Sequence, residues 1–149
     1  MRNSRFPLNN YSYAPVIMEK IIEIHDSTLS KIVHENEDVV LHFDPAYIIH
    51  SKGTILTDGG KGFVQNLKLL LKSCHVEIAD IETPIDLWTG ISNVDGKDYD
   101  NYIPIPLNVK KEFKVSFTGV TGGEFKATSA NAFIVELGEP EFVENIPKA

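Results

Sequence analysis

Apolar and polar side chains alternate with a period of two along most of this 149-residue sequence. The clearest case is residues 63–72, where Leu67, Leu69 and Leu71 share one face of a predicted strand, and Asn66, Lys68 and Lys72 share the other. Successive side chains of a β-strand point to opposite faces, so this pattern predicts strands with one buried face. No segment of ten residues or more has convincing helical spacing. Residues 29–33 fit both periods, and we favour a strand there because β-branched residues end the segment.

The alternation predicts an all-β protein of about nine antiparallel strands, separated by turn signals roughly every eight to twelve residues. A single-domain antiparallel β-sandwich and a barrel both fit this pattern. We expect one β domain over residues 18–149, preceded by a leader or arm over residues 1–17, with Met18 as an alternative start of translation. The predicted core comprises Leu67, Leu69, Leu71, Phe113, Val115, Phe117, Phe133, Val135 and Leu137.

Turn and edge signals divide the predicted strands. Asp95-Gly96 is a strong two-residue hairpin signal, and Gly122-Gly123 marks another turn. Pro104 and Pro106 cannot donate to a strand ladder and predict an edge, while Pro45 predicts a bend. Residues 57–62 are rich in glycine but lack the spacing of a phosphate-binding loop. Residues 139–149 are expected to form a tail without regular structure.

The charge balance is acidic, with 14 Lys and Arg against 21 Asp and Glu and a formal net charge of −7. Phosphate neutralisation dominates nucleic-acid affinity, so we expect no nucleic-acid partner. No run approaches the length of a membrane span, and no apolar stretch follows Arg2 and Arg5, so neither a membrane partner nor a signal peptide is expected. Cys74 is the sole cysteine, which excludes an intramolecular disulfide. The simplest expectation is a cytoplasmic protein.

Histidines and aspartates are densest between residues 25 and 50. His25 and Asp26 end one predicted strand, and His42 and Asp44 share a face of the next. His25, His42 and one of Asp26, Asp44 or His50 are candidates for a three-ligand metal site with an open position. The alternative is a set of polar residues on a solvated face, with His25 bonded to turn backbone. We favour this alternative and expect no cofactor.

Two further groups of residues invite a function. Ser27 could act as a nucleophile with His25 or His42 as base, but no Gly-x-Ser-x-Gly sequence frames it, and a turn or cap explains it as well. Trp88, Tyr99 and Tyr102 lie in a loop-rich stretch and could stack on a sugar or fill a pocket of a partner. Trp88 lies between apolar neighbours, and we favour a core position for it.

Three segments carry a resemblance to known proteins: residues 25–29 (His-Asp-Ser-Thr-Leu), residues 41–47 and residues 138–144. Together they resemble a group of small uncharacterised bacterial proteins with a His-Asp-Ser opening motif. The resemblance spans roughly residues 20–145 and implies no activity.

The combination of small size, acidity and no catalytic signature favours a non-enzymatic binding module that engages another macromolecule. We expect a protein partner, with the chain acting as an inhibitor or immunity-type protein against a basic target. A metal-assisted enzyme with a His/Asp site and a carbohydrate-binding module are the alternatives, and the oligomeric state stays open. The candidate binding residues are His25, Asp26, His42, Asp44, Trp88, Tyr99 and Tyr102.

Overall fold

The computed structural model describes residues 19–55 and 57–149, and the predicted leader over residues 1–17 lies outside these ranges. Within them the chain is all-β, with eleven strands and no helix, which confirms the predicted class. None of the described residues therefore forms a helix long and apolar enough to cross a membrane. The strands are β1 (Glu19–Glu23), β2 (Thr28–Glu35), β3 (Asp38–Ser51), β4 (Gly60–Ala79), β5 (Ile85–Val94), β6 (Lys97–Asp100), β7 (Tyr102–Ile105), β8 (Asn108–Val109), β9 (Phe113–Gly119), β10 (Glu124–Glu136) and β11 (Glu141–Ile146).

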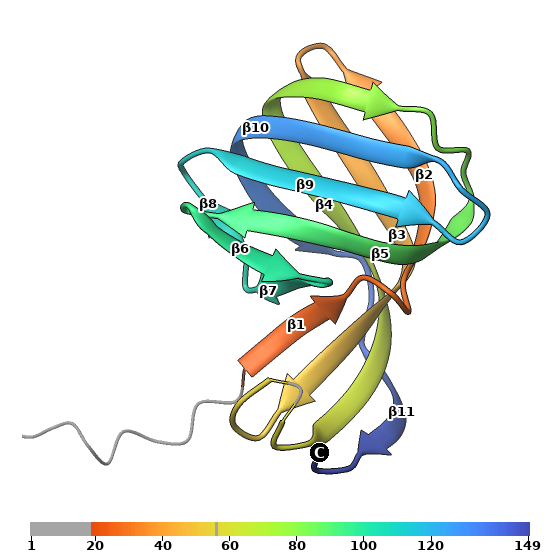
Figure 1. The fold of residues 1–149 in the computed structure, drawn as a ribbon, viewed down its shortest axis with the longest axis vertical. Coiled ribbons are helices and arrows are strands. Elements are labelled where there is room, and N and C mark those ends of the chain that lie inside the picture. The colour runs from red at the N-terminus through yellow and green to blue at the C-terminus, as the bar shows by residue number, and fades with distance from the viewer. Residues whose placement is uncertain (1–18, 56) are drawn as a thin grey trace, which may run out of the picture.

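All eleven strands belong to one antiparallel sheet, in the order β11-β4-β10-β9-β5-β2-β3-β1-β7. β3 also pairs with β4, so the strands β4, β10, β9, β5, β2 and β3 close into a ring (Figure 1). The short β6 and β8 pair with β5 and β10 at the side of the ring. The pairing that closes the ring between β2 and β5 is short, since only Thr28 and Leu29 of β2 pair with β5.

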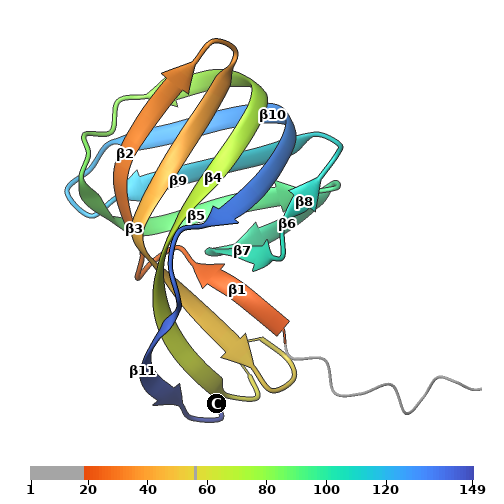
Figure 2. The ribbon, with the colours of Figure 1, turned by 180° about the vertical axis from the view of Figure 1, so that it is seen from behind.

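A second part of the sheet, here called the wing, extends below the ring. β3 and β4 are long enough to run through both parts, and their outer ends form the centre of the wing (Figure 2). β1 pairs with residues 47–51 of β3, β7 pairs with β1, and β11 pairs with residues 60–64 of β4. The level at which β3 and β4 leave the ring is called the waist.

The main core fills the ring. Of the predicted core residues, those at 67, 69 and 71 on β4 and at 113, 115 and 117 on β9 are buried, as alternation predicted. Ile22 and Ile48 of the wing join this core from one face of the wing sheet. The opposite face carries a small separate cluster of Ile21, Tyr47 and Ile49.

The prediction for the end of β10 is wrong. Phe133 is only partly buried, Val135 is 37% exposed and Leu137 is 51% exposed, while Ala132 is buried instead. Inward positions of β10 are odd-numbered up to Ser129 and even-numbered from Ala132. The partner strand β4 makes the same change at residue 73, whose φ of 47° lies in the left-handed region. The paired strands therefore exchange faces together, which simple alternation does not anticipate.

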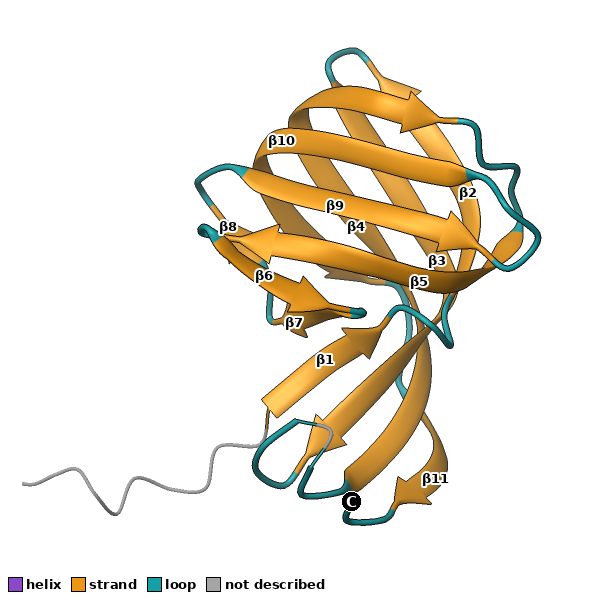
Figure 3. Ribbon diagram, viewed as in Figure 1, coloured by secondary structure: helices purple, strands orange, loops and turns teal. Residues whose placement is uncertain are grey.

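The predicted turns are present, whereas the C-terminal segment differs from its prediction. The pairs 95–96 and 122–123 have positive φ at both residues and join successive strands at loops (Figure 3). At Pro45, where a bend was predicted, β3 has a bulge between Phe43 and Ala46 and then continues to Ser51. Residues 139–149 are not merely a tail, since β11 forms within them.

Candidate functional site

The turn between β1 and β2 sits at the waist and is anchored by Ser27. Its hydroxyl donates to the Glu23 carbonyl at 2.7 Å and accepts the Tyr47 backbone N–H at 2.9 Å. Ser27 is buried, with 1% of its surface exposed. A hydroxyl that uses both its donor and an acceptor position on backbone, away from solvent, has a structural role. The arrangement gives no support to Ser27 as a nucleophile.

Two carboxyl groups, those of Glu23 and Asp26, meet at this turn. Glu23, at the end of β1, is half-buried, and its side chain is hydrogen-bonded to that of Asp26. Burial, the hydrogen bond to Asp26 and the nearby negative charges of Asp26 and Glu144 raise the pKa of Glu23 from 4.5 to about 7, against a smaller lowering by His25. Two carboxylates so close do not both ionise easily, so the pair holds a proton near neutral pH.

A third carboxyl reaches the same place from the wing edge. Glu144 of β11 accepts a hydrogen bond from the Tyr47 hydroxyl of β3. Burial and this bond raise the pKa of Tyr47. The Tyr47 ring crosses β4 at Gly62, where an added methyl group would overlap its hydroxyl end. The absence of a side chain at Gly62 is therefore what lets Tyr47 reach Glu144.

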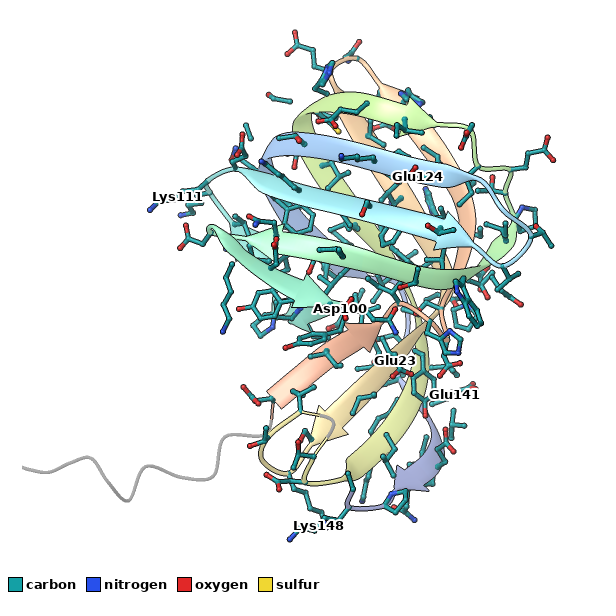
Figure 4. The ribbon with its side chains drawn as sticks, viewed as in Figure 1. Glu23, Asp100, Lys111, Glu124, Glu141 and Lys148 are labelled. Carbon is teal, nitrogen blue, oxygen red and sulfur yellow. The ribbon has the colours of Figure 1, made fainter. Side chains whose placement is uncertain are left out.

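These groups line a surface pocket of about 240 Å³, here called the waist pocket. Figure 4 shows Glu23 at the waist and Glu141 farther along the outer side of the wing. The pocket has three carboxyl groups and a tyrosine hydroxyl, and no lysine or arginine among its lining residues. Its lining is Glu23, Asp26, Tyr47, Ile49, Glu144, Asn145, Ile146 and Pro147.

An exposed aromatic pair stands beside the waist pocket. The Nδ1 atom of His25 lies 3.0 Å from the Trp88 carbonyl oxygen, and the two rings pack edge to face with centroids 5.1 Å apart. Trp88 is 58% exposed, so the prediction of a core position for it is wrong. It lies on the outer face of β5, where Leu87 points inward instead. His25 is therefore hydrogen-bonded to the backbone of β5 and not to Asp26. The Asp26 carboxyl group is hydrogen-bonded to Glu23 instead.

The other histidine candidates lie in separate places. His42 pairs across the sheet with Lys31 and Lys68, and its pKa is lowered by partial burial and by these two cations. His50 lies in the wing and packs against Phe63, with the two rings tilted by 37° and their centroids 4.3 Å apart. Asp44 is exposed at the bulge of β3. Among residues 19–55 and 57–149, no three His, Cys, Asp or Glu side chains gather as a metal site requires. The metal hypothesis therefore gains no support from these residues.

Tyr99 and Tyr102 lie together and line a different groove from the waist pocket, although Tyr102 pairs with Glu23 across the sheet. Their ring centroids are 5.2 Å apart, and the Lys97 ammonium lies 5.1 Å from the centre of the Tyr99 ring. Both tyrosines line a groove of about 390 Å³, to which β1, β6, β7 and the loop after β3 contribute residues. Ile21 and Ile55 contribute apolar surface to this groove.

The sequence analysis identified His25, Asp26 and Trp88, which the structure gathers at the waist, but missed Glu23, Tyr47 and Glu144. Glu23 and Tyr47 looked like ordinary strand residues, and Glu144 lay in the presumed tail. The one available signal was Gly62, a glycine at the start of a strong strand pattern, which indicates close approach by another group.

Comparison with known protein families, with curated proteins and with solved structures finds no match to this chain. The resemblance through the His-Asp-Ser motif stays a prediction.

Proposed function

We propose that the protein is a non-enzymatic binding module that engages a basic protein through the waist. The observation that carries this proposal is Trp88, 58% exposed and packed against His25 beside a pocket lined by carboxyl groups. A large aromatic side chain next to a polar rim is the usual composition of a binding hot spot.

The geometry of Trp88 favours binding energetically. The side chain stands on a strand, and His25 contacts one side of its ring. A side chain that is already held in place loses little conformational freedom when a partner covers it. Burying its exposed surface would contribute apolar stabilisation at about 25 cal/mol per Å² before other costs are counted.

Charge selects the class of partner. The waist pocket contains Glu23, Asp26 and Glu144, and the whole chain has a formal net charge of −7. An acidic field of this kind speeds the approach of a basic protein and disfavours acidic ones. We place this interaction in the cytoplasm, with the protein acting as an inhibitor or immunity-type partner that neutralises its target.

The test is affinity purification with three baits: wild type, Trp88→Ala and Ile91→Ala. Ile91 is the matched control, because it is an exposed apolar residue, 46% exposed, on the same strand but beside β6. We expect basic proteins that wild type and Ile91→Ala recover and Trp88→Ala loses. Identical recovery by all three baits, or a predominantly acidic set, would contradict the proposal.

Fluorescence gives an independent measurement, because Trp88 is the sole tryptophan of the chain. When a purified partner covers the ring, its emission should move to shorter wavelength. The same partner should bind Asp26→Lys at least tenfold more weakly, which corresponds to about 1.4 kcal/mol. Asp98→Lys, an equal charge change on the exposed β6, serves as the control.

The groove at Tyr99 and Tyr102 favours a carbohydrate-binding function as a second candidate. Its volume lies within the range of small-molecule sites, and two tyrosine rings and Lys97 line it. Calorimetric titration with a panel of neutral and acidic oligosaccharides would test it, with Tyr102→Ala as the variant expected to lose binding. Heat of binding that is absent for every sugar would exclude this candidate.

A further inference from the structure

The two outer strands of the wing differ in whether their free edge can pair with a strand of another chain. At one end of the strand order, β7 contains Pro104 and is followed by Pro106, neither of which has a backbone N–H to donate. At the other end, β11 has no proline between Glu141 and Ile146. Proline is one of the devices that protect a sheet edge from further pairing, and β7 has it whereas β11 does not. β11 has instead an irregularity at Val143, between Phe142 and Glu144, so a docking strand would pair on either side of that residue.

β11 is also unpaired along one side. Within residues 19–55 and 57–149, its only strand partner is β4, and it forms the outer border of the wing in both views (Figures 1 and 2). Its outer row of backbone N–H and C=O groups is therefore available for a ladder. Phe142 is 54% exposed and Val143 is 49% exposed, which gives an added strand apolar side chains to contact.

The charges along β11 decide which chain fits this edge. A second copy pairing antiparallel to β11 would bring Glu141 and Glu144 of both chains onto one short ladder. Like charges opposite one another destabilise a sheet, so self-pairing is disfavoured. The bulge at Val143 places Glu141 and Glu144 on one face of the sheet, opposite Val64 and Gly62 of β4. Lysine or arginine at alternate positions of an incoming segment would face these carboxylates, with an apolar residue between them for Phe142.

We propose that β11 is a docking edge for an extended basic segment of a partner protein, which adds to the wing as a further strand. This inference rests on the proposed function, because it names how part of the basic partner is held. Strand addition obtains affinity from the backbone ladder and selectivity from alternate side chains. Glu141 is free to meet such a segment because it lies on the outer side of the wing (Figure 4).

The test uses the full chain and labelled eight-residue peptides of alternating lysine and valine, with glutamate–valine peptides as the charge control. Two further lysine–valine peptides are N-methylated at alternate residues, one in each frame. Methylation removes backbone donors but keeps charge and side chains. We expect binding by fluorescence anisotropy, no binding of the acidic peptide, and at least a tenfold loss for one methylated frame only.

A pair of variants places the peptide on β11. Glu141→Lys should weaken binding at least tenfold, whereas Glu82→Lys, the same charge change at an exposed residue before β5, should leave it unchanged. Hydrogen exchange should slow at β11 amides when the peptide is added. Sedimentation of wild type alone should give a monomer.

Three outcomes would overturn the docking edge. If both methylated frames bind as well as the parent peptide, attraction is by charge alone, and the docking edge fails while a basic partner at the waist stands. If no lysine–valine peptide binds, β11 is not a docking edge. The proposed function is then tested separately by the affinity purification with wild type and Trp88→Ala. A wild-type dimer broken by Phe142→Asp would assign the edge to a second copy.

Discussion

The ring and the wing are stabilised by different means, although β3 and β4 run through both. The ring encloses a continuous core in which Phe43, Phe113 and Phe117 are buried. The wing is one layer thick, and the small cluster on its outer face has only Ile21, Tyr47 and Ile49 as buried members. Polar contacts supplement it, chiefly the hydrogen bonds of Ser27, Glu23 and Tyr47.

This difference teaches where the molecule is stable and where it is adaptable. Regions with few buried apolar contacts open at lower free energy than packed cores. Of the residues that we assign to binding, Glu23, Asp26 and Glu144 lie at the waist and on the wing, whereas Trp88 lies on the outer face of the ring strand β5. The core of the ring thus provides a fixed base, and the binding surface includes the wing and the part of the ring next to the waist.

Truncating one buried side chain in each part should show that the ring and the wing differ in stability. Leu69→Ala in the ring should cost about 3–4 kcal/mol, because its position is fully enclosed. Ile49→Ala in the wing should cost about 2 kcal/mol, because its small cluster can relax, and accelerate hydrogen exchange in β1 and β11 only. Denaturant melts and exchange measure both effects. Equal costs, with exchange rising everywhere, would mean that the two parts unfold as one unit.

A methyl group at Gly62 should disturb the wing alone. Gly62→Ala would overlap the Tyr47 ring and break its hydrogen bond to Glu144, at a cost of about 1–3 kcal/mol. Thermal melts measure this cost, and pairing with Tyr47→Ala should remove most of the additional effect, since the clash is then gone. Additive costs for the two substitutions would show that the methyl group at position 62 does not clash with the Tyr47 side chain.

The smallest effect concerns pH and the Glu23 carboxyl group. Its pKa is about 7 in the folded chain against 4.5 as the ordinary value, so the folded state holds the proton more tightly. This contribution to stability is complete below about pH 4.5, falls as pH rises, and is lost above about pH 7. The groups near Glu23 are Asp26, His25 and Glu144, and its partners across the sheet are Tyr47 on β3 and Tyr102 on β7.

Glu23→Gln keeps a polar side chain beside Asp26 and removes the ionisation. Its melting temperature should exceed that of wild type by a few degrees at pH 8 and change less between pH 5 and pH 8. Glu82→Gln, at an exposed position, is the control and should follow wild type. A variant that is less stable than wild type at pH 8 would argue against a buried, proton-holding pair.

Much of the fold could be predicted from local pattern. Alternation in β4 and β9 identified buried faces correctly, and the glycine-containing turns fell where predicted, because strand faces and turn conformations depend on neighbouring residues. The face change at Ser73 was not predictable, since it depends on a positive φ that serine rarely adopts. β11 was missed because its side chains are nearly all exposed and alternation is absent.

The site was predicted only in part for the same reason. His25 and Asp26 are adjacent in sequence, and their polar character marks the turn. Trp88, the partner of His25, lies 63 positions away and comes to the waist on a separate strand. Glu23, the partner of Asp26, is only three residues away but looked like an ordinary strand residue. The contact between Tyr47 and Glu144 spans 97 positions, and no local pattern encodes a contact at that separation.

The position of β11 along the chain has a consequence for biosynthesis. Every ring strand precedes β11, so a growing chain can close the ring before the residues that complete the wing have been added. The pairing of β11 with β4 is also among the most distant in sequence, and distant pairings form slowly. For a time after β10 is made, the outer end of β4 would stand without its cover, open to whatever extended chain is nearby. The unpaired end of β4 is therefore a place where a chaperone or the target can contact the nascent protein before β11 pairs there.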